Sequence, residues 1–282
     1  MNDILITGAH GQLGTELCKL LDDEQISYVA TGSEELDITN TGAVEAFISN
    51  QRPKVIYHCA AYTAVDAAEE EPGKSLDEKV NVDGTRNVAM AAEQVGAILV
   101  YISTDYVFDG ENDQAYVETD EINPQTEYGR TKALAEQIVQ ETMSKFYIIR
   151  TSWVFGQYGK NFVYTMLNLA KTHDTLTVVA DQIGRPTWTD TLAKFMVYAV
   201  NYKIDYGIYH LSNDHQASWF DFASAILKAT STQVNPVTSA EYPQKAKRPA
   251  HSVLSLEKTK ATGFNIPTWE SALEQMMSDI KE

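Results

Sequence analysis

Tyr128 and Lys132 stand four residues apart in the segment EYGRTKALAE, residues 127–136, where a helical pattern begins after an Asn-Pro pair. Residues four apart on a helix share one face, so the ammonium group could act on the phenol. A nearby cation favours phenolate and lowers the pKa of a tyrosine from about 10. We therefore expect Tyr128 to work as a general acid or base. The alternative is a plain half-exposed pair, because many helices carry Tyr and Lys at this spacing by chance.

A glycine-rich turn, GAHGQLG, follows the apolar run at residues 3–7 and leads directly into the helical pattern TELCKLL. Glycine permits a tight turn and lets backbone N–H groups approach a pyrophosphate at a helix N-terminus. Because a strand pattern precedes the turn and a helical pattern follows it, the segment predicts dinucleotide binding. The expected cofactor-binding residues in this turn are Gly8, His10, Gly11, Gln12, Leu13 and Gly14.

Two further clusters follow strand patterns. After residues 54–58, Ala60 and Ala61 keep the backbone approachable, and Tyr62 adds a hydroxyl that we also place against the cofactor. After residues 97–103, Thr104 and Asp105 stand at a strand end, where a hydroxyl can donate to a substrate carbonyl. In isolation such residues are more often loop caps. Taken in order along the chain, however, three parts would together support a reduction. The glycine turn would bind a hydride carrier, the hydroxyl cluster would polarise a carbonyl, and Tyr128 would donate a proton.

The segment after the second strand pattern bears on the choice of cofactor. An acidic residue at this point usually binds the ribose 2′-hydroxyl of NAD, but the chain continues TGS, and Glu34 and Glu35 come slightly late. No arginine is near for a 2′-phosphate, so both NADH and NADPH remain open. Asp37 and Ile38 either flank the adenine or start the next helix.

The pattern of apolar runs predicts the fold that must position these groups. Strand patterns at 3–7, 27–31, 54–58, 97–103 and 146–152 alternate with helical patterns near 12–22, 41–50, 75–95 and 128–143. Apolar strands separated by helices indicate a parallel sheet covered on both faces, a doubly wound α/β (Rossmann) fold.

The chain after residue 152 is less regular and richer in proline. Helical patterns lie near 161–172, 189–201, 218–229 and 268–280, with strand candidates at 175–179 and 207–211. We expect a dinucleotide-binding domain at 1–150 and a smaller, interleaved substrate-binding lobe at 151–282. Segments of about 172–188 and 238–262 are expected to return to the Rossmann domain.

The amino-acid composition limits the kinds of molecule that the protein can bind. The net charge of −17 argues against general affinity for nucleic acid or anionic membranes, since both need a basic surface. Cys18 and Cys59 offer neither metal spacing nor a disulfide framework. No run approaches the roughly 18 apolar residues of a membrane span, and the first residues enter a strand pattern without a basic leader. We expect a cytoplasmic protein.

Segments spread along almost the whole chain resemble the extended short-chain dehydrogenase/reductase family: ITGAHGQLG, HCAAYTAVDAAE, NVDGTRNVA, YISTDYVFDG, EYGRTKALAE, RTSWVFG, GKNFV, DQIGRPT, YHLSN and KRPAHSVL. Within it, they are similar to the reductases that form dTDP-L-rhamnose. The resemblance implies NAD(P)H-dependent reduction of the C4 ketone of dTDP-4-dehydro-L-rhamnose. It places Thr104 and Tyr128 at the carbonyl, Lys132 on the cofactor ribose, and Asp105 and Trp153 against the sugar nucleotide.

The substrate diphosphate needs cationic or amide donors, which an acidic protein must gather locally. Asn161, Arg185 and Arg248 are the candidates, Arg248 lying in the basic stretch KAKRP. A solvated loop is the alternative for that stretch, and a core aromatic is the alternative for Trp153.

The resemblance also implies that some members of the family form dimers in which glutamates bind a bridging magnesium ion. Glu16 and Asp190 lie in roughly the corresponding regions, but the pattern does not match residue for residue. We therefore expect no metal site and leave monomer and homodimer open. Two other functions also stay open: a sugar-nucleotide epimerase or dehydratase, and a non-catalytic, NADP-binding regulatory subunit such as that of methionine adenosyltransferase.

Overall fold

The computed structural model describes residues 3–280 and is built around a six-stranded sheet in the order β2-β1-β3-β4-β5-β10. Every neighbouring pair in this sheet is parallel, which confirms the doubly wound prediction. The strands are β1 (Ile4–Thr7), β2 (Val29–Thr31), β3 (Val55–His58), β4 (Ile98–Thr104), β5 (Phe146–Thr151) and β10 (Gly207–His210). Strand order reverses between β1 and β3, so ligands are expected beyond the carboxyl ends there.

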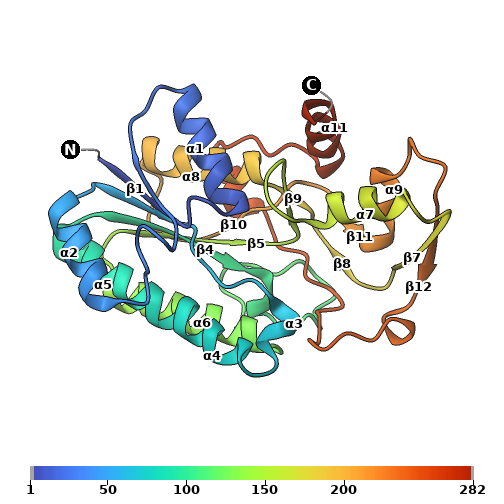
Figure 1. The fold of residues 1–282 in the computed structure, drawn as a ribbon, viewed down its shortest axis with the longest axis horizontal. Coiled ribbons are helices and arrows are strands. Elements are labelled where there is room, and N and C mark those ends of the chain that lie inside the picture. Colours follow the sequence, from blue (N-terminus) through green and yellow to red (C-terminus); the bar gives the residue numbers. More distant parts are fainter. Residues whose placement is uncertain (1–2, 281–282) are drawn as a thin grey trace.

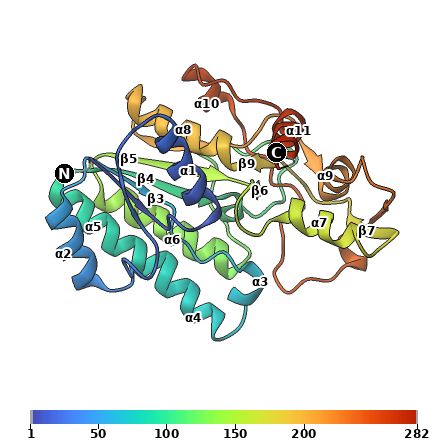
Figure 2. The ribbon, with the colours of Figure 1, turned by 45° about the horizontal axis from the view of Figure 1, so that its top comes forward.

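Helices cover both faces of the sheet (Figures 1 and 2). On one face α2 (Thr41–Gln51), α5 (Thr85–Val95) and α6 (Glu127–Thr142) bury a core with Leu5, Ile56 and Leu99. On the other face α1 (Gln12–Asp23) packs beside α8 (Thr189–Asn201). The strands are therefore buried on both sides, which explains why their sequences are apolar throughout.

The helical pattern expected at 75–95 consists of three different pieces. These are the end of α4 (Gly73–Asp77), a π-helix, η1 (Glu78–Gly84), and α5, into which η1 runs directly. The short helix α3 (Val65–Ala68) comes before them. π-Helices are rare and occur frequently at functional sites.

A second lobe lies beyond the carboxyl ends of the sheet (Figure 1). Its apolar core joins α7 (Phe162–Ala170), α9 (Trp219–Ile226) and α11 (Trp269–Asp279). Three small two-stranded sheets complete it: β6 (Val154–Phe155) with β9 (Thr187–Trp188), β8 (Ile183–Gly184) with β11 (Ala217–Ser218), and β7 (Thr175–Val179) with β12 (Gln233–Val237). Within residues 3–280 the short 3₁₀ turns are η2 (Asp105–Val107) and η3 (Ser239–Glu241).

The two lobes are interleaved, but the expected returning segments need correction. We expected the segment 172–188 to return to the Rossmann domain. This was wrong for β7, which pairs with β12 and packs in the core of the second lobe. The elements that return to the main sheet are α8 and β10 instead. Of the segment 238–262, the later part contacts the Rossmann domain. Leu254 packs beside the 3₁₀ turn after β4, and α10 (Glu257–Ala261) contacts β10. Short β-branched runs do not reveal which sheet they join, because pairing partners are remote in sequence.

None of the helices within residues 3–280 has the length and apolar character needed to cross a bilayer.

Candidate functional site

The start of α6 is seated against the turn that follows β4. Thr126 caps the helix by accepting a hydrogen bond from the Gly129 N–H at 3.0 Å. A Cβ at Gly129 would lie 2.2 Å from the Tyr106 carbonyl oxygen, so only glycine allows this approach. The close contact brings Tyr128, in the first turn of α6, to Thr104 at the end of β4.

Thr104 and Tyr128 place two hydroxyl groups side by side. A hydrogen bond between them opposes the rise in the pKa of Tyr128 that burial causes. The Thr104 hydroxyl also donates to Asp105 Oδ1 at 3.1 Å and accepts from the Tyr106 N–H at 3.2 Å. The Tyr106 ring meets the Tyr128 ring edge-on, with 5.7 Å between centroids. The structure therefore brings together the two residues that we predicted at the reacting carbonyl.

Lys132 shares this helix face but acts differently from our expectation. Its side chain is only 2% exposed, its ammonium donates to the Ile102 carbonyl oxygen at 2.7 Å, and it lies 4.1 Å from the centroid of the Tyr101 ring. Burial lowers the pKa of Lys132 to about 7. Burial also raises the pKa of Tyr128 well above its usual value. The prediction of a lowered tyrosine pKa was therefore wrong for this structure, because desolvation of the phenolate, and to a smaller extent the nearby Asp105, raise the pKa of Tyr128.

Asp105 is buried beside these hydroxyls. Burial raises the pKa of its carboxyl to about 6, against the opposing effect of hydrogen bonds from Ser252 and Thr104. Among the described residues its Oδ2 atom has no fully formed hydrogen bond, and neither has the buried hydroxyl of Ser103 on the same strand end. Such unsatisfied polar groups at the carboxyl edge of the sheet are suited to a polar ligand.

The glycine turn presents an open helix N-terminus. Gly11 caps α1 without a side-chain hydrogen bond, and the first turn holds no acidic residue. The N–H groups at Gln12 and Leu13 thus have no side-chain partner from the cap, an arrangement that fits a phosphate. A Cβ at Gly8 would lie 2.5 Å from the Ala60 nitrogen, and one at Gly14 would lie 2.2 Å from the Gly8 oxygen. Gly8 therefore packs the turn tightly against the loop after β3, and Gly14 packs α1 against the turn.

The loop after β3, with Ala60, Ala61 and Tyr62, is held by a residue that the sequence analysis did not single out. The Asn81 side chain on η1 accepts from the Tyr62 N–H at 2.9 Å and donates to the Tyr62 carbonyl at 3.1 Å. The segment NVDGTRNVA holds two asparagines, Asn81 and Asn87, and the partner of Asn81 lies 19 residues earlier, so it cannot be inferred from spacing.

The end of β2 does carry an acidic group. Glu35 folds back so that its carboxylate accepts from the Gly32 N–H at 2.7 Å, with His10 Nδ1 3.9 Å away. Glu35, which follows the end of β2 by four residues in sequence, therefore places its carboxylate at the strand end. Asp37 is exposed and accepts hydrogen bonds from Thr39, whereas Ile38 is 6% exposed and packs in the core.

Trp153 and Asn161 connect the second lobe to the sheet. Trp153 has a left-handed backbone (φ 48°), and its ring stacks on Trp219 with centroids 3.7 Å apart. A Cβ at Gly184 would lie 2.6 Å from this indole. Asn161 caps α7, and its amide donates to Gln12 Oε1 at 2.8 Å, which ties the second lobe to the glycine turn. A bulky side chain held with positive φ is strained, as is common at ligand sites.

The two candidate arginines are committed to different carboxylates. Arg248 makes a two-pronged contact with Asp66, with N–O distances of 3.0 and 2.6 Å. Arg185 donates to Asp214 at 2.7 Å, and Asp214 also accepts from Lys260. The structure does not join these arginines in one ion-pair network. Arg248 nevertheless lies on the wall of a cavity, which Arg185 does not.

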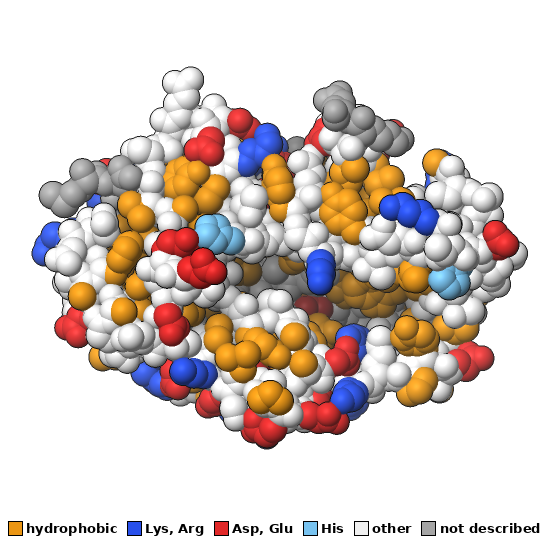
Figure 3. All heavy atoms as spheres, viewed as in Figure 1, with side chains coloured by type: hydrophobic (Ala, Val, Ile, Leu, Met, Phe, Trp, Pro, Cys, Tyr) orange, Lys and Arg blue, Asp and Glu red, His pale blue; other side chains and the backbone are white. Residues whose placement is uncertain are grey.

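That cavity, of about 340 Å³, lies in the second lobe and is mainly apolar. Figure 3 shows the face between the lobes hollowed, with apolar side chains inside the hollow on the second-lobe side. The sequence analysis missed most of the lining, because it comes from four separate segments. The lining residues are Phe162, Thr165, Met166, Leu169, Thr177, Val178, Val179, Gln182, Trp219, Tyr242, Gln244 and Arg248.

The residues considered for magnesium have protein partners. Glu16 accepts from the Thr189 hydroxyl at 2.6 Å, and Asp190 pairs with Lys194 at 2.7 Å. Across residues 3–280 no three His, Cys, Asp or Glu side chains are grouped so as to hold a metal ion.

The class of the protein follows from where these groups meet. An uncapped helix N-terminus follows β1, and the Tyr128 and Thr104 hydroxyls lie at the same carboxyl edge of the sheet. This is the arrangement of a Rossmann dinucleotide-binding protein of the short-chain dehydrogenase/reductase type.

Comparison with known proteins gives the family. The model of the RmlD substrate binding domain family matches residues 1–282, and the chain belongs to this family. It is 44% identical to a dTDP-4-dehydrorhamnose reductase from Aggregatibacter actinomycetemcomitans, over 98% of each chain.

Solved structures agree with this assignment. A dTDP-4-dehydrorhamnose reductase from Clostridium acetobutylicum matches with TM-score 0.95 and 43% identity over 99% of both chains. One from Bacillus anthracis, solved in complex with NADP, matches with TM-score 0.93 and 42% identity over 99% of this chain and 100% of that one.

Proposed function

We propose that the protein is an NAD(P)H-dependent oxidoreductase that reduces the C4 ketone of dTDP-4-dehydro-L-rhamnose to dTDP-L-rhamnose. One observation carries the proposal: the Tyr128 and Thr104 hydroxyls meet at the carboxyl edge of the sheet, the same edge at which the glycine turn follows β1. The full-length relatives named as reductases of this substrate support the choice of sugar nucleotide.

Tyr128 would deliver a proton to the carbonyl oxygen as the ketone becomes an alcohol. The reduced nicotinamide, when bound, supplies the hydride. Because burial raises the pKa of Tyr128, the phenol is protonated at neutral pH, which is the form a general acid requires. Thr104 hydrogen-bonds to Tyr128 and would stabilise negative charge that develops on the same oxygen.

Lys132 and the glycine turn would hold the cofactor. The buried Lys132 ammonium is fixed by the Ile102 carbonyl and retains N–H donors for a ribose hydroxyl. The N–H groups of Gln12 and Leu13 face the position for a pyrophosphate at the N-terminus of α1.

The second-lobe cavity would hold the nucleotide part of the substrate. Its apolar wall with Phe162 and Trp219 suits a base, and Arg248 supplies a cation for the diphosphate. Trp153, stacked on Trp219, would lie against the sugar, with Asp105 beside it at the end of β4. Asn161 and Arg185 keep their predicted substrate roles only as proposals, since their side chains contact Gln12 and Asp214.

The test is a spectrophotometric assay with dTDP-4-dehydro-L-rhamnose, with NADH and NADPH in parallel and a UDP-linked ketosugar as control. Substrate-dependent loss of reduced-cofactor absorbance is expected with the dTDP sugar. Folded, cofactor-binding protein that oxidises neither cofactor would contradict the proposal. Stoichiometric bound NAD without net turnover would favour the epimerase or dehydratase, and co-purification with an adenosyltransferase would favour the regulatory subunit. A cytoplasmic location and the choice between monomer and homodimer stay predictions.

A further inference from the structure

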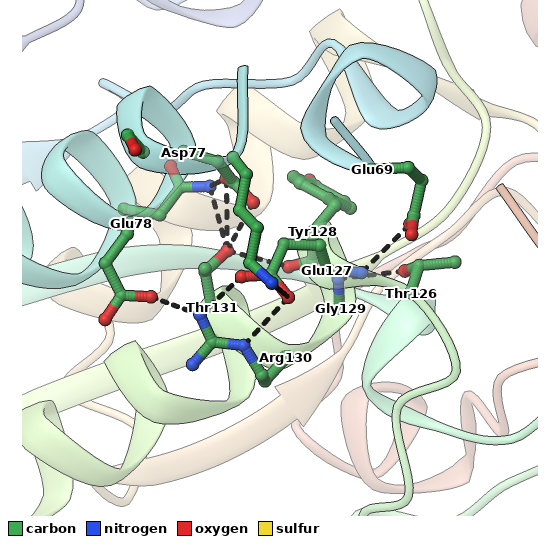
Figure 4. Close-up of polar contacts among 12 residues, drawn as sticks. Glu69, Asp77, Glu78, Thr126, Glu127, Tyr128, Gly129, Arg130 and Thr131 are labelled. Atoms are coloured by element: carbon green, nitrogen blue, oxygen red, sulfur yellow. Dashed lines mark hydrogen bonds and ion pairs between the residues drawn. The ribbon is translucent and has the colours of Figure 1, made fainter. Parts of the chain in front are cut away.

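A fully buried carboxylate lies behind the Tyr-Lys pair and has no part in the chemistry described above. Asp77, at the end of α4, is 0% exposed. Its carboxylate accepts hydrogen bonds from the Asn81 amide and from the Thr131 hydroxyl, whose oxygen lies 3.1 Å from both carboxylate oxygens. Thr131 stands between Tyr128 and Lys132 in the sequence, and Figure 4 shows it between Asp77 and the backbone of α6.

The same contacts connect the cofactor side of the site to the catalytic helix. Asn81 holds the backbone of Tyr62 in the loop after β3 and also donates to Asp77. Asp77 in turn contacts Thr131 on α6. One buried carboxylate thus joins the loop, the π-helix and α6, so a change in its charge reaches each of them.

The hydroxyl of Thr131 has only one proton and two acceptors within reach. It lies 3.1 Å from Asp77 and 3.0 Å from the Tyr128 carbonyl oxygen, and it can donate to one of them at a time. An ionised Asp77 favours that donation, since a buried carboxylate is costly unless its oxygens accept hydrogen bonds, and the Asn81 amide binds only one of the two oxygens. The charge on Asp77 therefore determines which neighbour Thr131 binds.

A count of buried charges assigns Asp77 a partner. Lys132 and Arg150 are 2% and 1% exposed, and a buried cation needs a counter-charge. Glu136, 0% exposed, has the stronger effect of the two nearby carboxylates on Lys132, but it already accepts three hydrogen bonds from Arg150 at 2.9, 3.2 and 2.7 Å. Arg150 thus balances Glu136. Asp105 is also buried, but it lies at the end of β4 with Thr104, so Asp77 is the remaining carboxylate that acts on Lys132 and balances its charge.

We propose that Asp77 is a positioning residue for the reduction: its buried carboxylate is the counter-charge that keeps Lys132 an ammonium ion, and it holds Thr131 between the two catalytic residues. The inference rests on the proposed function only for the role of Lys132. The charge relation between Asp77 and Lys132 rests on the burial of both side chains and on Thr131, which Asp77 holds next to Lys132 on α6.

Other ionisable groups around this pair have charged partners of their own. Glu127 on α6 is bound by Arg130, which also pairs with Glu78 on the π-helix (Figure 4). The groups that act on Asp77 or Lys132 from the elements around them are Glu127, Tyr128, Glu136, Tyr101, His58 and Cys59. The test must therefore follow Lys132 itself and not activity alone.

The experiment titrates the lysine side chains by NMR in full-length protein carrying isotope-labelled lysine, with the Lys132 signal assigned by its loss in Lys132→Met. In Asp77→Asn the midpoint of Lys132 should fall by about one pH unit, because an opposite charge has been removed. The alkaline limb of the kcat profile should move in the same direction. Asp83→Asn is the matched control, since it removes an exposed carboxylate from the same π-helix.

An unchanged Lys132 midpoint in folded Asp77→Asn would overturn the proposal, as would an equal fall in Asp83→Asn. If Asp77→Asn does not fold, Thr131→Val decides. It removes the hydrogen bond that supports an ionised Asp77, so the Lys132 midpoint should fall by a smaller amount, and no fall would overturn the proposal. Absence of ketosugar turnover in the unmodified protein would contradict the proposed function but leave the titration as the test of Asp77.

Discussion

The two halves of the site hold their side chains in different ways. On the sheet side, Thr104 at the end of β4 and Tyr128 in the first turn of α6 bring their hydroxyls together. On the second-lobe side, Arg248 and Arg185 come from loops, and both are bound by carboxylates of the protein. The comparison teaches that rigid elements present groups free for chemistry, whereas loop cations in an acidic protein acquire protein partners.

The largest expected effect is on the sheet side. Tyr128→Phe removes the proton donor without changing the ring, so kcat should fall by about 10²- to 10⁴-fold while the Kd for the cofactor changes little. Steady-state kinetics and fluorescence titration measure the two quantities. Tyr202→Phe, at a side chain 70% exposed, is the control. Turnover like that of the unmodified protein in Tyr128→Phe would sink the mechanism.

The pH dependence of stability should have opposite signs in the two halves. The pKa of Asp105 is raised from 3.8 to about 6, so the folded state binds the extra proton and this contribution to stability grows as pH falls through about 6. Asp105→Asn should therefore raise the free energy of unfolding at pH 7 by up to about 3 kcal/mol, a gain that vanishes by about pH 4.

Asp214 provides the contrast in the second lobe. Burial acts to raise its pKa, but hydrogen bonds from Lys260, the His215 N–H and Arg185 together lower it. Its stabilising effect is present at neutral pH and is lost in acid, so Asp214→Asn should destabilise at pH 7 and converge with the unmodified protein at low pH. Denaturant titrations at several pH values measure both variants. If both substitutions changed the free energy of unfolding at pH 7 in the same direction, the contrast between the two halves of the site would be wrong.

A smaller effect is expected from the bound arginine. Arg248→Met should raise KM for the ketosugar about tenfold or more, because a charged hydrogen bond contributes about 1.5–3 kcal/mol. Asp66→Asn should raise KM less, and the double variant should resemble Arg248→Met if Asp66 acts by orienting Arg248. The comparison weakens if KM is unchanged in Arg248→Met.

The smallest effect concerns cofactor choice. Glu35→Gln removes a negative charge at the end of β2, so kcat/KM for NADPH should rise a few-fold relative to NADH. The effect is modest because the side chain is 46% exposed and its field is screened by solvent. Glu34→Gln is the matched control. Equal changes in the two variants would show a general charge effect and no specific role for Glu35.

The sequence by itself determined the sheet and the order of its chemical groups. Strand and helix periods are local, so the patterns at 54–58, 97–103 and 128–143 predicted β3, β4 and α6 within a few residues. The four-residue spacing also fixed Tyr128 and Lys132 on one helix face.

Only the tertiary structure decided what surrounds those groups. Desolvation reversed the expected pKa shift of Tyr128, since burial depends on packing from elements far apart in sequence. Asp66 pairs with Arg248, which lies 182 residues later in the sequence, and the Glu35 carboxylate folds back to the end of β2. Pairing between loops, sheet membership and local dielectric are set by the assembled fold, and no local sequence pattern records them.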